Sequence, residues 1–525
     1  MSTSRSYEAA LQKLAQLQSN RAVTHLFDKT PDRQVLTRTQ APAQQHLNLN
    51  AAAVPEMLEW LRRAGYSPSD LSRMRHIHVA GTKGKGSVCA FATAMLREYG
   101  AHGTRGGPVG TYTSPHLVSP RERIAINGQP LSQDVFAAYF FDLWDRFTAS
   151  AGNVVDAATA EGPASKPFFF RFLTILAWHV FLGERVRSVV MECGIGGEYD
   201  ATNVLPAGAV SAAVVTHLGV DHVAMLGDTV EQIAWHKAGI FKSGVRAFTM
   251  NVGARQPAVM QVLRQRARDK GAVLVEVEEE DVEAWARRTN IQGNLPGEFQ
   301  KRNQALAVMA VKEHLRGFSA AAAASDTSSS SSSSSSLLDE ALPGQMVRGL
   351  TTASLRGRCE VLRHQGSTWL LDGAHTHDSL EQVAKWVAAQ NGPPGAGDEN
   401  KDEKPELVLL FNQQERNAPA LLKALVAALQ RETGRRDVFS HAVFTRNELQ
   451  QPLQQPHDHV AVQEGAAAMM ESICPGCTTT VTNNVVSGVE EARRRLGGRQ
   501  GKVLVTGSLH LVGGVMQVLE PNSVL

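Results

Sequence analysis

The stretch from His78 to Met95, HVAGTKGKGSVCAFATAM, decides the fold of the surrounding chain. Apolar residues lead into a glycine-rich segment, Gly81 to Ser87, and an apolar run over 88–96 has helical character. A strand, a glycine turn and a helix form the setting of a phosphate-binding loop, because glycines let backbone N–H groups approach a phosphate. A lysine then reaches the outer phosphates, and a serine hydroxyl joins a magnesium shell. The pattern predicts a nucleotide-binding loop, and its alternative is a plain glycine turn with two solvated lysines.

The segment departs from the strict phosphate-loop consensus in two places. If Gly84 and Lys85 are its glycine–lysine pair, a glycine is expected at position 79, where the chain has Val79. Gly86 follows the lysine directly, so that Ser87 comes one place late. Spacing alone therefore leaves both interpretations open.

The composition is that of an ordinary globular protein, and it argues against nucleic-acid binding, a disulfide framework and a membrane span. The 525 residues are 43% hydrophobic and 20% charged, and a net charge of +2 gives no basis for binding nucleic acid. Five cysteines, an odd number, fit a reducing compartment and argue against a disulfide framework. We find no apolar run of about 20 residues, so no membrane span is expected, and no signal-peptide core.

These features favour a cytoplasmic protein. Arg5 and the nearby serines give a faint hint of a transit peptide, but Glu8 and an early amphipathic helix oppose it. A mitochondrial form made from another start site stays open.

Strand-like and helix-like segments alternate along the chain, which is typical of a parallel α/β sheet. We expect a phosphate-loop ATP-binding domain over 1–352 and a smaller, Rossmann-like α/β domain over 353–525, joined by a hinge near Thr351 to Arg358. Inside the first domain, residues about 319–338 contain alanines and the nine-serine run Ser328 to Ser336, which cannot bury a core. We predict that this stretch is a disordered insertion.

Polar residues at the ends of predicted strands are candidates for a metal site. Glu192 ends a short strand, and a carboxylate there, opposite a phosphate loop, is where a magnesium ligand belongs. Ser114 is by itself better explained as the start of a Ser-Pro turn. His222 is a candidate metal ligand or a satisfied loop histidine. Lys237 lies in a mostly apolar segment. A lysine there either extends its ammonium group to the solvent or is buried with a shifted pKa and a chemical role.

Seven motifs occur in one order along the chain: GTKGKGS (81–87), TSPHL with ERIAING (113–128), ECGIGG with YDATN (192–203), HLGVDH with LGDTVEQIAWHKAGIFK (217–242), RGR before CEVL (356–362), DGAH (372–375) and VLVTGSLHLVGG (503–514). Together they closely resemble the folylpolyglutamate synthase family of the Mur ligase superfamily. The resemblance spans residues 6–516 and is far more specific than any one motif, and the atypical loop is the form that this family uses. Asp372-Gly-Ala-His375 is followed by Thr376-His377, where many bacterial relatives have Asn-Pro, so the chain is similar to the eukaryotic type.

The resemblance implies an ATP-dependent ligase. Such enzymes join L-glutamate to the terminal γ-carboxylate of a reduced folate or its polyglutamate and release ADP and phosphate. The carboxylate is first phosphorylated to an acyl phosphate, because a carboxylate is a poor electrophile and phosphorylation supplies a leaving group. Catalysis then consists mostly of positioning and charge neutralisation.

The resemblance also assigns roles to residues. Two Mg²⁺ ions would bridge the ATP phosphates and the incoming carboxylate. Arg358 and Asp372 come from the second domain, so that ATP would be shared by both domains and closure would complete the site. The amides Gln300 and Asn303, which are otherwise explained as solvated helix residues, match positions near adenine. The phosphate loop would consist of Gly84, Lys85, Gly86 and Ser87, one magnesium would be held by Ser114 and Glu192, and the second by His222.

Lys237 matches a lysine that relatives carry as a carbamate. A free lysine has a pKa of about 10.4 and its cation would be repelled by magnesium. Burial lowers that pKa, and reaction with carbon dioxide gives an anion that helps to hold the metal site. We therefore predict a catalytic role for Lys237, beside Lys85 and His222. A monovalent cation, potassium, is a further expected cofactor.

Two other functions compete with this hypothesis. A dihydrofolate synthase shares the chemistry but adds the first glutamate to dihydropteroate, and Arg121, Arg123 and the segment 168–170 are where a pterin pocket would discriminate. A regulatory phosphate-loop switch would turn over ATP slowly, without regard to folate or glutamate. The family resemblance favours a monomer whose partners are ATP, a reduced folate polyglutamate and L-glutamate.

Overall fold

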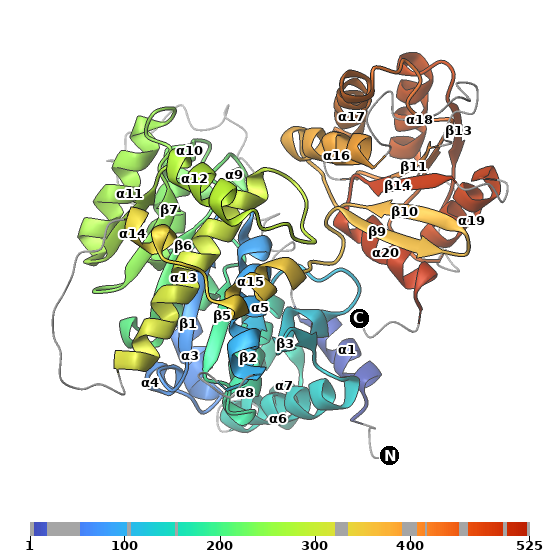
Figure 1. The fold of residues 1–525 in the computed structure, drawn as a ribbon. Helices are drawn as coiled ribbons and strands as arrows, with labels where there is room; N and C mark the ends of the chain where they lie inside the picture. Colours follow the sequence, from blue (N-terminus) through green and yellow to red (C-terminus); the bar gives the residue numbers. More distant parts are fainter. Residues whose placement is uncertain are drawn as a thin grey trace, which may run out of the picture. The chain divides into compact units, whose positions relative to one another are not determined.

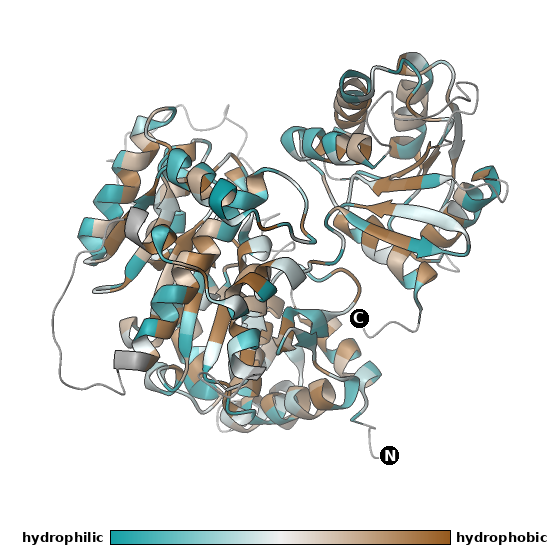
Figure 2. Ribbon diagram, viewed as in Figure 1, coloured by the Kyte–Doolittle hydropathy of each residue, from teal (hydrophilic) through white to brown (hydrophobic). Residues whose placement is uncertain are grey.

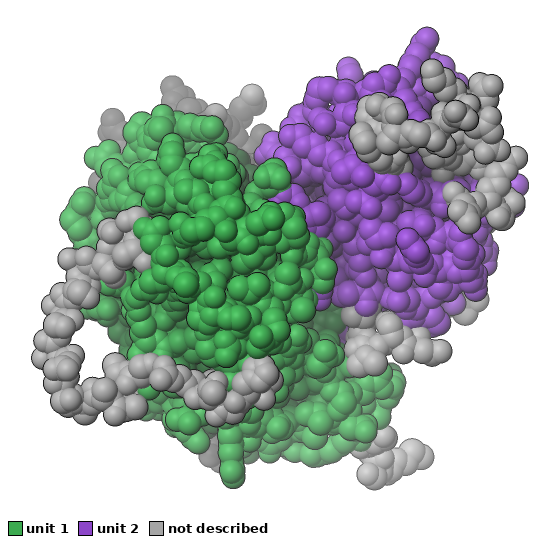
Figure 3. Space-filling view, in the orientation of Figure 1, with its two compact units in different colours: residues 1–116, 120–294, 298–353 green, residues 117–119, 295–297, 354–525 purple. Residues whose placement is uncertain are grey.

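The computed structural model describes residues 5–17, 53–101, 107–152, 156–320, 334–390, 407–414, 417–450, 460–496 and 501–521. The chain divides into two compact units (Figure 3). Unit 1 comprises residues 1–116, 120–294 and 298–353, and unit 2 comprises residues 117–119, 295–297 and 354–525. Each unit is built around its own sheet (Figure 1).

The sheet of unit 1 has eight strands in the order β4-β3-β2-β5-β1-β6-β7-β8. All neighbours from β2 to β8 run parallel, while β3 and β4 add an antiparallel edge. Strand β1, which leads into the glycine-rich segment, lies between β5 and β6. The strands are β1 (Arg75–Ala80), β2 (Val109–Tyr112), β3 (Ile124–Ile126), β4 (Gln129–Pro130), β5 (Ser188–Glu192), β6 (Val210–Val215), β7 (Arg246–Met250) and β8 (Val273–Val277).

Helices surround this sheet, and several of them, such as α5 and α13, pack against its strands. Helix α8 is the most apolar helix of unit 1, and its side chains from Phe172 to Leu182 are all buried. The helices are α1 (Tyr7–Gln16), α3 (Ala53–Arg63), α4 (Pro68–Leu71), α5 (Lys85–Ala101), α6 (Gln133–Ala151), α7 (Ala157–Glu161), α8 (Phe169–Gly183), α9 (Val223–Leu226), α10 (Val230–Lys237), α11 (Pro257–Lys270), α12 (Glu279–Thr289), α13 (Phe299–Ala320), α14 (Ser334–Asp339) and α15 (Gly344–Thr352).

Unit 2 has a six-stranded sheet in the order β13-β12-β11-β14-β10-β9, in which only β9 runs antiparallel to its neighbour. Helices α16, α17 and α18 contribute to one apolar cluster of this unit, and α19 and α20 contribute to another. The elements are β9 (Glu360–His364), β10 (Ser367–Leu371), α16 (His377–Ala389), β11 (Leu407–Phe411), α17 (Ala418–Thr433), β12 (His441–Phe444), α18 (Ala461–Ile473), β13 (Thr478–Val481), α19 (Val485–Leu496), β14 (Lys502–Thr506) and α20 (Leu509–Leu519).

Both sheets are parallel-dominated, which confirms the predicted α/β fold class. In Figure 2 the strands within each sheet are mostly brown, and many outward helix faces are teal. This is the pattern expected of parallel strands that are buried on both sides. No helix among the described residues is long and apolar enough to cross a membrane.

The structure corrects two local expectations. Helix α5 begins at Lys85, so Lys85, Gly86 and Ser87 belong to its first turn and not to the preceding turn. Residues 321–333 of the predicted disordered insertion lie outside the described residues, but its last two residues, Leu337 and Leu338, are buried in α14. Their apolar side chains pack, whereas serines offer no such surface.

Candidate active site

The glycine-rich loop between β1 and α5 is held by the segment that follows β6. The backbone N–H groups of Thr82 and Lys83 both donate to the carbonyl oxygen of His217, at 2.8 and 3.3 Å. The Thr82 hydroxyl donates to the carbonyl oxygen of Gly219 at 3.0 Å. The loop therefore has a fixed shape before any ligand arrives, which suits it to present N–H groups at the start of α5.

Two glycines are required by this shape. A Cβ atom at Gly81 would overlap the side chain of Thr216. Gly84 has a φ of +90°, and a Cβ atom there would lie 2.6 Å from Oδ1 of Asn303. Only glycine meets both the left-handed backbone and the close approach at Gly84.

Two predicted catalytic lysines meet at one carbonyl group. Nζ of Lys85 donates to the carbonyl oxygen of Gly81 at 3.1 Å, and Nζ of Lys237 donates to the same oxygen at 2.8 Å. Lys237 is only 2% exposed. Burial, and then the charge of Lys85, lower the pKa of Lys237 to about 7. The neutral amine is therefore a substantial form of Lys237 at physiological pH.

The predicted metal ligands Glu192 and Ser114 are also brought together. Glu192 ends β5, next to β1, and its side chain is 5% exposed. Its Oε1 lies 3.9 Å from Nζ of Lys85, and its Oε2 accepts a 3.1 Å hydrogen bond from the backbone N–H of Ser114. A buried carboxylate and a hydroxyl-bearing residue thus lie beside the phosphate loop.

His222 lies on the surface before α9. Its φ of 51° is left-handed, its side chain is 45% exposed, and its Nε2 lies 3.8 Å from Oδ2 of Asp221. Among the residues that the structure describes, no three His, Cys, Asp or Glu side chains gather into a group able to hold a metal by themselves. Magnesium commonly takes one or two carboxylates and completes its shell with water and phosphate oxygens.

Gln300 and Asn303 contact the phosphate loop. Gln300 donates from Nε2 to Oγ of Ser87 at 3.2 Å, and Asn303 donates from Nδ2 to Oε1 of Gln300 at 2.9 Å. Both side chains are buried. These hydrogen bonds brace the first turn of α5 and the loop at Gly84, and the adenine contact stays a prediction for both amides.

Arg358 and Asp372 belong to unit 2 and lie near each other there. Burial raises the pKa of the Asp372 carboxyl, and the charge of Arg358 acts in the opposite direction. The carboxylate accepts hydrogen bonds from the backbone N–H groups of Cys359, at 2.8 Å, and Ala374, at 2.9 Å. Asp372 therefore ties the turn before β9 to the end of β10.

One residue of unit 1 was missed by the sequence predictions. Oδ2 of Asp200 accepts hydrogen bonds from the backbone N–H groups of Gly194, at 2.9 Å, and Ile195, at 3.0 Å, and so shapes the loop that follows Glu192. Oδ1 of Asp200 accepts from the hydroxyl of Thr202 at 2.6 Å. The signal was available, because an aspartate two residues before a threonine is typical of a side-chain-capped turn.

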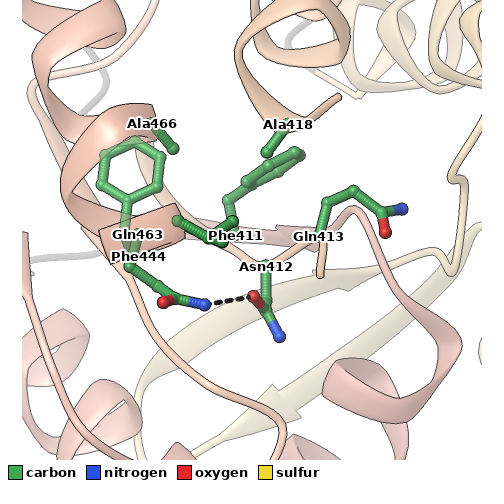
Figure 4. A pocket seen from close by; sticks show the side chains of 8 residues that line it. Phe411, Asn412, Gln413, Ala418, Phe444, Gln463 and Ala466 are labelled. Carbon is green, nitrogen blue, oxygen red and sulfur yellow. Dashed lines mark hydrogen bonds between the residues drawn. The ribbon is translucent and has the colours of Figure 1, made fainter. Parts of the chain in front are cut away.

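Unit 2 has a small depression at the ends of β11 and β12. Figure 4 shows Phe411 and Phe444 beside the amides Asn412 and Gln463, and Nε2 of Gln463 donates to Oδ1 of Asn412 at 2.9 Å. The depression has no room for a water molecule.

A parallel sheet with a phosphate loop at its centre, a buried carboxylate beside the loop lysine and a second α/β unit define a phosphate-loop nucleotide-binding protein of two units. Comparison with known proteins shows which family within this class the chain belongs to. Residues 358–518 match the family model described as dihydrofolate synthetase, C-terminal domain. A folylpolyglutamate synthase of Saccharomyces cerevisiae (strain FostersO) is 36% identical over 531 aligned residues, covering 98% of this chain and 87% of the relative. The chain belongs to the folylpolyglutamate synthase family, whose members are ATP-dependent ligases that add glutamate to folates.

Solved structures are similar in fold over nearly the whole chain. The folylpolyglutamate synthase of Mycobacterium tuberculosis, complexed with ADP and AMPPCP, has a TM-score of 0.63 at 22% identity and covers 97% of this chain and 99% of its own. An Escherichia coli protein in complex with DHPP and ADP has a TM-score of 0.56 at 20% identity, with coverages of 96% and 98%. The full-length yeast relative favours the polyglutamate ligase over the dihydrofolate synthase and the ATP switch.

Proposed function

We propose that unit 1 binds ATP on the loop between β1 and α5 and uses it to activate the γ-carboxylate of a reduced folate, which L-glutamate then attacks. The observation that carries this proposal is the position of the Lys85 ammonium, 3.1 Å from the Gly81 carbonyl oxygen and 3.9 Å from the Glu192 carboxylate. A lysine in the first turn of the helix that follows β1 thus lies beside the carboxylate that ends the adjacent parallel strand β5. ADP and AMPPCP in the Mycobacterium tuberculosis relative support a nucleotide as the ligand.

Each loop residue has a part in this proposal. Gly84 gives the turn, and the N–H groups of Lys85, Gly86 and Ser87 lie in the first turn of α5, where the helix dipole favours anions. The Lys85 side chain neutralises the outer phosphates. Gln300 and Asn303 keep the loop in place through Ser87 and Gly84.

The donor set fits Mg²⁺, because Glu192 and Ser114 offer hard oxygen ligands and the shell still has places for phosphate oxygens. When bound, magnesium supplies the positive charge that draws phosphate and carboxylate together. Glu192 and Ser114 would hold one ion, and His222, with its exposed ring, would serve a second. A potassium ion is the further cofactor that we propose.

Lys237 is proposed to act as a carbamate. Carbamate formation needs a neutral amine, and burial with the Lys85 charge lowers the pKa of Lys237 to about 7. The carbamate would form on a nitrogen that now donates to the Gly81 carbonyl oxygen at 2.8 Å, the same oxygen to which Lys85 donates at 3.1 Å. Conversion relieves the repulsion between the two lysines and gives Lys85 a counter-charge.

Arg358 and Asp372 are proposed to contact ATP from unit 2. Asp372 is buried and hydrogen-bonded to two backbone N–H groups, which fixes the turn that carries Arg358. We further propose that the protein acts as a cytoplasmic monomer, with a mitochondrial form made from another start site.

Oxygen transfer tests the acyl phosphate. The substrate is tetrahydrofolate whose terminal γ-carboxylate carries oxygen-18, incubated with MgATP and L-glutamate. Attack of a carboxylate oxygen on the γ-phosphorus, followed by expulsion of phosphate by the amine, moves one labelled oxygen into the phosphate released. Label in the phosphate is the expected result, and unlabelled phosphate released together with glutamylated folate would overturn the acyl-phosphate route.

A further inference from the structure

We propose that Arg123 binds the α-carboxylate of the terminal glutamate of the folate substrate and so fixes which carboxylate is presented for phosphorylation. This inference rests on the proposed function and assigns one part of its substrate site. Arg123 immediately precedes β3, at the end of the sheet that carries Glu192.

The strand register places Arg123 near the catalytic edge of the sheet. Ile124 of β3 pairs with Tyr112 of β2, and Tyr112 pairs with Met191 of β5, the residue before Glu192. The backbone N–H of Thr113 donates to the carbonyl oxygen of Arg123 at 3.1 Å, which continues the ladder by one residue. Arg123, Thr113 and Glu192 therefore follow one another across the ends of three adjacent strands.

The guanidinium is held in place by neutral groups. Its Nε donates to Nδ1 of His116 at 2.9 Å, and its Cζ lies 5.5 Å from the centre of the Phe169 ring. An arginine stacked on an aromatic ring and anchored at Nε keeps its two terminal nitrogens aligned as a fork. Such a fork matches a carboxylate in a bidentate pair.

The charge of Arg123 lacks a close counter-ion within the described part of the chain, where no carboxylate forms an ion pair with it. Burial lowers the pKa of Arg123, while interactions with Tyr112, Glu192 and Glu122 act in the opposite direction. A half-buried guanidinium without an ion pair costs desolvation free energy, unless an anionic ligand pairs with it. The substrate supplies such an anion.

The apolar surroundings indicate which anion this is. Phe170 lies 6.0 Å from the ring of Tyr112 and packs against Gly194 in the loop after Glu192, so the Arg123 edge also carries an aromatic surface. Folates have an aromatic acyl group followed by glutamate, and every terminal glutamate keeps a spectator α-carboxylate whatever the tail length. The γ-carboxylate must reach the phosphoryl group beside Lys85 and Glu192, which leaves the α-carboxylate for Arg123.

A substrate–enzyme double cycle tests this assignment. One substrate is tetrahydrofolate, and the other is the analogue in which 4-aminobutyrate replaces the terminal glutamate, so that the γ-carboxylate remains and the α-carboxylate is gone. The enzymes are the wild type, Arg123→Gln, Arg123→Lys and the control Arg121→Gln. Arg121 is buried and donates to the carbonyl oxygen of Leu131 at 2.7 Å, so its loss is structural.

We expect Arg123→Gln to lower kcat/KM for tetrahydrofolate by about 10- to 100-fold, which corresponds to the loss of a charged hydrogen bond. The kcat/KM for the 4-aminobutyrate analogue should change little. Arg123→Lys, which keeps the charge but loses the fork, should give an intermediate loss on tetrahydrofolate and serves if the Gln variant does not fold. The KM for ATP should not change. Arg121→Gln should affect both substrates alike.

The inference would be overturned if Arg123→Gln lost kcat/KM equally on the two substrates. It would also be overturned if this variant had a raised KM for free L-glutamate and an unchanged KM for the folate. These results leave glutamylation by the wild type intact and so contradict only the role of Arg123. A wild type that glutamylates neither substrate would instead overturn the proposed function and this inference with it.

Discussion

The side-chain ammonium groups of Lys85 and Lys237 donate to the same backbone oxygen, that of Gly81, at 3.1 and 2.8 Å. Burial of Lys237, and then repulsion by the charge of Lys85, lower the pKa of Lys237 to about 7. This pair joins the phosphate loop to α10. The charge of the site therefore depends on whether Nζ of Lys237 is protonated.

The buried lysine should make folding stability depend on pH. Its pKa is about 7 in the folded protein and about 10.4 in the unfolded chain, so between these values the unfolded state binds more protons. The free energy of unfolding contributed by Lys237 should therefore rise with pH across this window, by at most about 1.4 kcal/mol per unit. Urea unfolding of the wild type and of Lys237→Met at pH 7, 8 and 9 measures it, in buffer freed of carbon dioxide. Parallel pH profiles for the two proteins would contradict the lowered pKa.

Bicarbonate should restore activity to enzyme depleted of carbon dioxide. The neutral Lys237 amine attacks carbon dioxide, one proton leaves the nitrogen, and a carbamate results, so at equal dissolved carbon dioxide recovery should be faster at pH 8 than at pH 6. The measurement is ATP turnover in the presence of folate and glutamate after addition of bicarbonate. Lys237→Met should neither lose activity on depletion nor regain it. Full activity of the depleted wild type would show that the carbamate is not needed.

Loss of the Glu192 carboxylate should change the magnesium requirement. Glu192→Gln removes a negative ligand but keeps the size of the side chain, and we expect kcat to fall by at least about 100-fold and the Mg²⁺ needed for half-activity to rise. Ser114→Ala should act in the same direction more weakly. Glu198→Gln is the matched control, because Glu198 pairs with Arg266 and Lys270 and has no assigned role at the metal site. A magnesium dependence equal to that of the control would count against the metal role.

The phosphate loop should not tolerate a side chain at Gly84. Gly84→Ala combines a left-handed backbone with a contact of 2.6 Å to Asn303, whereas Gly244→Ala has a φ of +72° and no neighbour within 4 Å. Both variants should lose stability by about 1 kcal/mol from backbone strain, but only Gly84→Ala should lose nucleotide binding. Calorimetric titration with ADP separates them. Equal ADP affinity in the two variants would refute the assignment of the loop.

Much of the fold follows from local patterns, and the site follows only in part. The strand and helix around the glycine-rich segment were predicted from their apolar runs, and Glu192 ends a strand as predicted. The short strand Thr478–Val481 carries three threonines and only one apolar residue, so no local apolar run indicates it.

The proximity of Glu192 and Lys85 was expected because parallel strands bring their carboxyl ends to one edge, whereas Ser114 was placed beside them only by the family resemblance. The bracing of the phosphate loop was not foreseen, since the hydrogen bond from Gln300 to Ser87 joins residues 213 positions apart. Nothing local in either segment indicates the other. Contacts of this kind are decided by how α13 packs beside α5, which a single sequence does not display.

The mass of the product tests the central claim most directly. The purified protein is incubated with tetrahydrofolate, L-glutamate, MgATP and potassium, and the folate products are weighed by mass spectrometry. A ladder of successive glutamyl additions is the predicted result. The account would be contradicted if tetrahydrofolate gained no glutamate while dihydropteroate gained one, or if ATP were hydrolysed with neither product formed.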